Sequence, residues 1–353
     1  MTSVDLEQIQ VSANGTDQNV LVGGPADGIP VLLIHGNCSS AAFWAPLLRH
    51  LPVTLRVVAP DLRGYGTTTP APVDATRGLR DFADDVAALL DRPELFSRAG
   101  ARPVVVGHSM GGGVAMQLLV DHPDRVAGLL LEAPLSPYGF GGTRDCDGTP
   151  TTDDFAGAGG GAANPEFVRL LAAGDRGDGQ FSPRTLLRAL YVADPAALGD
   201  DEELLLDSVL STVTGEDNYP GDSTPSDNWP GTAPGRRGVL NAMSPRWFGR
   251  AAALVAVPAP KPPVVWVRGD ADAIVSDASM TDLANLGKLG VVPGWPGEPA
   301  CPPHPMVSQT RAVLERYAAA GGHYREVCYP GVGHSPHVER PARFAKEILQ
   351  LLS

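Results

Sequence analysis

Short apolar runs alternate with amphipathic stretches along much of the chain, and these two patterns predict strands and helices in turn. Residues 4–22 alternate like two antiparallel edge strands joined by a turn at Asn14-Gly15. Buried strands are predicted at 31–34, 55–59, 103–106, 126–131, 264–268 and 324–329, and helices from Ser39 and at 76–90, 114–120, 306–319 and 341–352. Strands alternating with helices predict an α/β fold with a mostly parallel central sheet and helices on both faces.

The alternation stops between Pro134 and about Arg250. That interval contains a glycine-rich stretch at 157–161, an extended run at 219–229 and apolar helical pieces near 166–173, 183–192 and 201–213. We therefore expect residues 135–250 to form an inserted, mainly helical cap. The core domain would then consist of two parts, residues 1–134 and 251–353.

Composition narrows the choice of protein class. The chain has 353 residues, of which 43% are hydrophobic and 19% charged, as expected of a globular protein with a large core. The 41 glycines and 34 prolines indicate long irregular connections. A formal net charge of −13 argues against nucleic acid as a partner, since phosphate binding needs clustered Lys and Arg.

No signal peptide or membrane-spanning run is visible in the sequence, so we expect a cytoplasmic protein without a membrane partner. The four cysteines, Cys38, Cys146, Cys301 and Cys328, lack metal-type spacing. Reduced thiols are the favoured interpretation, and a bridge between Cys146 and Cys301 is the alternative that the sequence leaves open.

The segment Val104–Gly113 holds the most informative motif, Gly107-His108-Ser109-Met110-Gly111. An apolar strand is followed here by a helix, with a serine at the turn between them. A sharp turn of this kind forces the serine into a strained conformation and requires small residues two positions away. Gly107 and Gly111 meet that requirement, so Ser109 is the candidate nucleophile.

A serine hydroxyl needs a base to take its proton and an acid to orient that base. His334, just after the last predicted strand, is the candidate base, and Asp272, just after the preceding strand, is the candidate acid. His337 competes with His334 but is expected to line the entrance or face solvent. The alternatives to Asp272 are Asp270 and, more remotely, Glu132.

Attack by a serine also creates an oxyanion that needs hydrogen-bond donors. The Met110 amide at the elbow is one candidate donor. The loop after the first parallel strand, His35-Gly36-Asn37-Cys38, offers the Asn37 amide as the second, with Cys38 as its neighbouring alternative.

Together these motifs, with Asp61-Leu62-Arg63-Gly64-Tyr65-Gly66 and Gly269-Asp270-Ala271-Asp272, resemble those of the α/β-hydrolase superfamily over residues 20–133 and 255–353. The resemblance implies a Ser109, His334 and Asp272 triad that needs no metal or organic cofactor. It leaves several serine-dependent reactions open.

The leading hypothesis is a serine hydrolase for an ester or lactone of a moderately apolar small molecule, acting as a monomer or homodimer. Carbon-carbon bond hydrolysis and aminopeptidase activity are alternatives within the same fold. A non-catalytic small-molecule receptor is a remote one.

Overall fold

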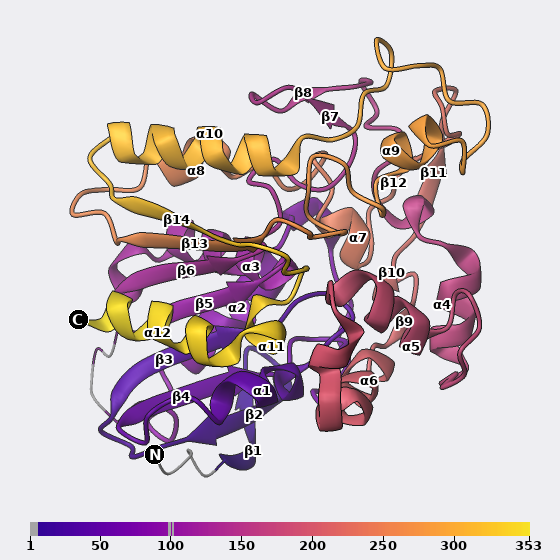
Figure 1. The fold of residues 1–353 in the computed structure, drawn as a ribbon. Helices are drawn as coiled ribbons and strands as arrows, with labels where there is room; N and C mark the ends of the chain where they lie inside the picture. Colours follow the sequence, from indigo (N-terminus) through magenta and orange to yellow (C-terminus); the bar gives the residue numbers. More distant parts are fainter. Residues whose placement is uncertain (1–5, 98–99, 101) are drawn as a thin grey trace.

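The computed structural model describes residues 6–97, 100 and 102–353, and an eight-stranded sheet forms its centre (Figure 1). The strand order is β1-β2-β4-β3-β5-β6-β13-β14. β1 pairs with β2 and β2 with β4 in antiparallel fashion, and the other neighbours are parallel, which confirms the predicted sheet. The bounds are β1 Leu6–Ala13, β2 Thr16–Gly23, β3 Ile29–Ile34, β4 Leu55–Pro60, β5 Val104–His108, β6 Gly128–Glu132, β13 Val264–Gly269 and β14 Tyr324–Tyr329.

The first two strands form the expected hairpin. Positive φ angles of 50° at Asn14 and 75° at Gly15 give the tight turn that the Asn-Gly pair predicts. Of these two strands, β1 lies at an edge of the sheet, whereas β2 also pairs with β4 and so is not an edge strand. Residues 4 and 5, at the start of the predicted strand, lie outside the described residues.

Helices cover both faces of the sheet because alternate strand residues point to opposite sides. In β3, Leu32 and Ile34 belong to one core cluster, whereas Val31 and Leu33 belong to the other. The first cluster includes residues of α2 (Arg80–Leu89), α3 (Met110–Asp121), α8 (Ala251–Val255) and α10 (Met306–Ala319). The second includes residues of α1 (Ala45–Leu48) and α12 (Pro341–Leu352).

The bounds of the two longest predicted C-terminal helices agree with the structure. α10 and α12 have the predicted bounds, 306–319 and 341–352. The helix expected from Ser39 is instead a short 3-10 turn, η1 (Ala41–Trp44), that continues into α1. The stretch 76–90 is divided into η2 (Ala75–Arg77) and α2 by Gly78, whose φ is 62°.

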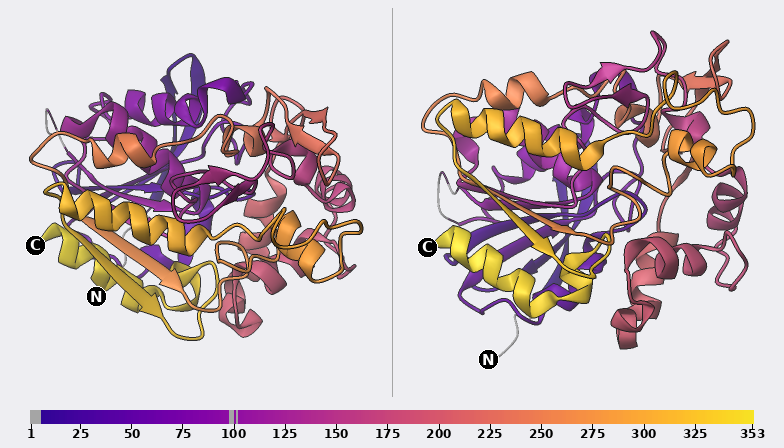
Figure 2. Two further views of the ribbon diagram at one scale, coloured as in Figure 1. Left: turned by 90° about the horizontal axis from the view of Figure 1, so that it is seen from above. Right: turned by 45° about the horizontal axis from the view of Figure 1, so that its top comes forward.

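Residues 135–250, the inserted region, contribute no strand to the central sheet and lie beside the carboxyl ends of its strands (Figures 1 and 2). The three predicted helical pieces contain α4, α5 with a π-helix, and α6, and short paired strands accompany them. The bounds are β7 Thr143–Arg144, β8 Thr149–Pro150, η4 Gly160–Ala162, α4 Pro165–Ala172, α5 Pro183–Leu186, π-helix η5 Leu187–Tyr191, η6 Pro195–Asp201, α6 Glu202–Leu210, β9 Thr214–Gly215, β10 Tyr219–Pro220, β11 Ser223–Pro225, β12 Thr232–Pro234 and α7 Val239–Ala242.

A third apolar cluster joins the inserted region to the core domain. It combines Leu187, Leu205 and Leu206 of the inserted region with Phe43 after β3 and Val338 of α11 (Pro336–Glu339). The inserted region is therefore packed against the loops at the carboxyl ends of the strands. The remaining short helices are η3 Pro123–Arg125 and α9 Leu283–Lys288.

The four cysteines are free thiols, so the Cys146–Cys301 bridge is not formed. Cys146 is exposed, whereas Cys38 and Cys301 are buried. Burial raises the pKa of the Cys38 thiol to about 12, which keeps it protonated and unreactive. Within the described part of the chain, no helix is long and apolar enough to cross a membrane.

Candidate active site

Ser109 lies at the tip of a sharp turn between β5 and α3, as predicted. Its φ of 55° and ψ of −118° are unusual for a residue with a side chain. A Cβ atom added at Gly107 would lie 2.4 Å from the carbonyl oxygen of Gly111, and one at Gly111 would lie 2.2 Å from that of Ile34. The two glycines are thus required by close contacts, and the partly exposed Ser109 stands above the sheet edge.

Asp272 and His334 form a buried hydrogen-bonded pair. Nδ1 of His334 lies 2.9 Å and 3.1 Å from the two carboxylate oxygens of Asp272. The main-chain N–H groups of Ile274 and Val275 donate to Oδ1 of Asp272 at 2.8 and 2.9 Å. The turn after β13 is therefore built around the carboxylate of Asp272. Because Asp272 contacts Nδ1 of His334, the other ring nitrogen, Nε2, takes no part in the pair.

The loop of His334, the candidate base, is linked to the turn of Ser109 through the residue before the serine. Nε2 of His108 lies 3.0 Å from the carbonyl oxygen of His334, and the centroids of the two rings are 4.8 Å apart. Among the described residues, no hydrogen bond joins the Ser109 hydroxyl to His334. The structure thus brings Asp272 and His334 together directly, and links their loop to the elbow through His108.

Both candidate oxyanion donors are main-chain amides without a protein acceptor among the described residues, Met110 at the start of α3 and Asn37 after β3. Their loops approach closely, because a Cβ atom at Gly36 would lie 3.0 Å from Cβ of Ser109. Tyr65 holds the Asn37 side chain, donating its hydroxyl to Oδ1 at 2.7 Å. These features suit stabilisation of negative charge next to Ser109.

His35 supports the same loop from inside the core. The Leu62 N–H donates to Nε2 of His35 at 2.9 Å, and Nδ1 lies 2.8 Å from the carbonyl oxygen of Gly36. The ring is therefore neutral, with its proton on Nδ1. Burial lowers the pKa of His35 to about 4, although the nearby Asp61 carboxylate acts in the opposite direction.

The alternatives weighed from the sequence lie elsewhere. Asp270 is exposed and accepts the Gly331 N–H at 2.7 Å rather than contacting His334. Glu132 contacts His337 and not His334. The expectation that His337 lines an entrance or faces solvent is wrong, because its side chain is fully buried. The ring pairs there with the equally buried carboxylate of Glu132, at the end of β6.

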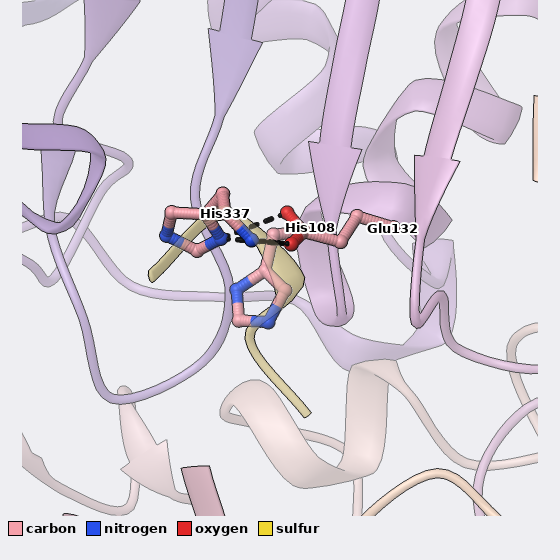
Figure 3. Close-up of side chains that lie close together, drawn as sticks. All are labelled: His108, Glu132 and His337. Carbon is pink, nitrogen blue, oxygen red and sulfur yellow. Dashed lines mark hydrogen bonds and ion pairs between the residues drawn. The ribbon is translucent and has the colours of Figure 1, made fainter. Parts of the chain in front are cut away.

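His108, Glu132 and His337 form a buried group of side chains that are common metal ligands (Figure 3). Nδ1 of His337 lies 2.9 Å from each carboxylate oxygen of Glu132, and Nε2 lies 3.1 Å from the carbonyl oxygen of Phe43. Because both nitrogens face oxygen acceptors, the hydrogen bonds fit a doubly protonated ring with no lone pair for a metal. This geometry favours a buried ion pair over a metal centre.

Comparison with known proteins agrees with the fold. The sequence model of the "Alpha/beta hydrolase family" matches residues 31–347. The chain belongs to the alpha/beta hydrolase family.

Relatives within the family carry several activities in their names. RutD of Variovorax paradoxus (strain S110), named as a carbamate hydrolase, is 47% identical over 111 residues, or 31% of this chain and 40% of that protein. Lipase LipV of Mycobacterium tuberculosis (strain ATCC 25618 / H37Rv) is 39% identical over 121 residues, or 33% of this chain and 42% of that protein. The match thus spans about two fifths of the length of these curated relatives.

Among solved structures, the 2-hydroxy-6-oxo-6-phenylhexa-2,4-dienoate hydrolase (BphD) from Rhodococcus sp. strain RHA1 superimposes with a TM-score of 0.58 at 19% identity. The superposition covers 99% of both chains. At this level of identity the likeness shows the fold.

Proposed function

We propose that this alpha/beta hydrolase family member is a serine hydrolase that cleaves an ester or lactone of a moderately apolar small molecule. The observation that carries the proposal is the buried Asp272–His334 pair in a loop joined to the strained elbow of Ser109. A lipase and a carbamate hydrolase among the named relatives support attack at an acyl carbon.

The reaction would proceed in two steps. Ser109 Oγ attacks the acyl carbon while Nε2 of His334 takes its proton, and Asp272 stabilises the imidazolium that forms. The N–H groups of Met110 and Asn37 stabilise the oxyanion. His334 then gives the proton to the leaving alcohol, and water hydrolyses the acyl-enzyme by the same route in reverse.

The inserted region would act as a cap that selects the substrate. It packs against the loops after β3 and β14 through the apolar cluster of Phe43, Leu205 and Val338. In such a cap, apolar side chains would favour a small apolar acyl or alcohol group.

The first test replaces Ser109 with alanine and measures hydrolysis of p-nitrophenyl esters of increasing acyl length. Wild-type protein should hydrolyse them and should react with a fluorophosphonate probe. S109A should lose about 10⁴-fold or more of the wild-type kcat, because no other group replaces the nucleophile.

The matched control is S97A, since Ser97 is exposed and its hydroxyl donates to the main-chain oxygen of Ala26, away from the elbow. Wild-type rates in S109A, or no probe labelling of the wild type, would contradict the proposal. Turnover of a dienolic diketone without turnover of simple esters would replace ester hydrolysis by carbon-carbon bond hydrolysis.

A further inference from the structure

Tyr191 connects the inserted region to the loop that carries a candidate oxyanion donor. It is the last residue of the π-helix, an element that often occurs at functional sites. Its hydroxyl lies 3.2 Å from each of the main-chain carbonyl oxygens of Asn37 and Cys38, which share its one proton. Its ring also lies edge-on to the His334 ring, with centroids 6.1 Å apart.

The loop that Tyr191 contacts needs to be held in place. Cys38 has a φ of 46°, in the left-handed region that side chains other than glycine rarely adopt. Such a conformation persists only where its surroundings fix it. Tyr191 holds the main chain of Asn37 and Cys38, while Tyr65 holds the Asn37 side chain from the core side.

The residues that follow Tyr191 are fixed to the loop of the base. Glu339, which is buried, accepts the N–H of Ala193 at 3.1 Å and that of Asp194 at 3.3 Å. The same carboxylate accepts the Gly333 N–H at 2.6 Å, directly before His334. One side chain therefore ties the inserted region to the base loop.

We propose that residues 191–194 are a positioning element of the active site, in which the Tyr191 hydroxyl fixes the main chain on the carboxyl side of the candidate donor Asn37 and thereby the position of its N–H beside Ser109. This inference rests on the proposed function. Tyr191 is a positioning residue, since its hydroxyl bonds to main-chain oxygens rather than to the reacting atoms. Burial raises the pKa of Tyr191 well above its usual value, so the hydroxyl remains a donor at assay pH.

Removing this hydroxyl should act on kcat rather than on KM. An oxyanion donor interacts with charge that develops in the transition state, whereas the substrate in its ground state gains little from it. A small displacement of such a donor therefore slows the chemical step and leaves substrate binding nearly unchanged.

The test compares Y191F with Y317F. Tyr317, fully buried on α10, also donates its hydroxyl to a main-chain carbonyl, that of Pro262 at 2.6 Å, but at the opposite end of β13 from Asp272. We expect Y191F to lower kcat about 10- to 100-fold with KM and Tm close to wild type. Y317F should leave kcat unchanged. A phenylboronic acid, which forms a tetrahedral adduct with the serine, should bind Y191F more weakly by a similar factor.

An unchanged kcat in Y191F, or a rise in KM alone, would overturn the inference. If Y191F is too unstable to assay, E339Q takes its place, and wild-type kcat in E339Q would overturn the inference equally. The wild-type protein tests the proposed function separately. If the wild type shows neither ester turnover nor fluorophosphonate labelling, both the proposed function and the role of Tyr191 are contradicted. If the wild type is active and Y191F is equally active, only the role of Tyr191 is contradicted.

Discussion

The His35 ring is held in one neutral form by the main chain on both sides. Nε2 accepts the Leu62 N–H, so a second proton on the ring would remove that hydrogen bond inside the core. This agrees with a pKa of about 4, well below the usual 6.5 of histidine. The same ring supports the Gly36-Asn37 turn next to Ser109.

The pKa of His35 predicts a loss of stability in mild acid. The unfolded chain takes up the proton near pH 6.5, whereas the folded protein resists it until about pH 4. Lowering the pH through this window therefore favours unfolding, and the loss levels off below about pH 4. His35 should contribute about 3 kcal/mol of the difference in unfolding free energy between pH 7 and pH 4, measured by urea titration.

The variants H35Q and H50Q provide the comparison. His50 is exposed, so H50Q should keep the wild-type dependence of unfolding free energy on pH. H35Q should show a shallower dependence. An equal dependence in all three proteins would mean that other groups cause the acid sensitivity.

The sequence locates residues whose role depends on local turns and misses those whose role depends on distant contacts. Ser109, Asp272 and His334 follow strands and have a glycine within three positions, and these are features that a local pattern shows. Tyr191 lies 154 positions from Asn37 along the chain, and nothing local to it indicates the contact. The sequence does not indicate the contact of Glu339 either, since its partner Ala193 lies 146 positions away.

At the scale of elements, Glu132 joins β6 to α11. Its carboxylate accepts both the main-chain N–H and the ring N–H of His337, while its main-chain oxygen accepts the Ser109 N–H at 2.9 Å. Both side chains of the pair are fully buried. The end of one strand thus fixes the elbow and the helix that follows the base loop.

Breaking this pair should be costly, because a buried charge without its partner is poorly solvated. E132Q keeps the size of the side chain and one acceptor oxygen but leaves His337 without its counter-charge. We expect the unfolding free energy to fall by about 3–5 kcal/mol, measured by urea titration at pH 7.

The matched control is E166Q, which breaks the exposed pair of Glu166 and Arg169 on α4. Water already solvates both charges, so its stability should stay close to wild type. Similar stability losses in E132Q and E166Q would show that burial does not govern the Glu132–His337 pair.

Element bounds are predictable where an amphipathic helix is long and less so near turns. The stretch 306–319 forms one helix because Val313, Leu314 and Tyr317 repeat on one buried face. The stretch from Ser39 shows a similar apolar pattern but starts with a 3-10 turn, which the pattern does not distinguish from an α-helix. Short strand pairs such as β9 and β10 consist of two residues each, too few for a periodic signal.

At the scale of the whole molecule, two of the three apolar clusters attach the inserted region. One packs Val239 and Met243 with the helices on one face of the sheet. The other, here called the shared cluster, combines Leu205 and Leu206 of α6 with Phe43 and Val338. The members of each cluster come from distant segments, so the sequence predicts an insertion but not its contacts. We expect the inserted region and the core domain to unfold together.

Two neighbouring leucines on α6 test this attachment. Leu205 is fully buried in the shared cluster, whereas Leu204 is 39% exposed. L205A should lower the unfolding free energy by about 2–5 kcal/mol, as expected for a cavity in a packed core. L204A should change it by no more than about 0.5 kcal/mol.

Urea unfolding of L205A, followed by tryptophan fluorescence and far-UV circular dichroism, should give coincident transitions. Two separate transitions would show that the inserted region is an independent unit. Equal stabilities of L204A and L205A would contradict the role of the shared cluster.

The carboxylate of Glu339 has a consequence for protein engineering. Because it bonds to the inserted region and to the loop of the base at once, residues 191–194 belong physically to both. Under the proposed function, we therefore expect substitutions in residues 191–194 to change substrate specificity and rate together. A chimaera that takes residues 135–250 from another family member should keep Tyr191 and a segment that Glu339 can bind. Without these contacts, we expect the loops of Asn37 and His334 to change position.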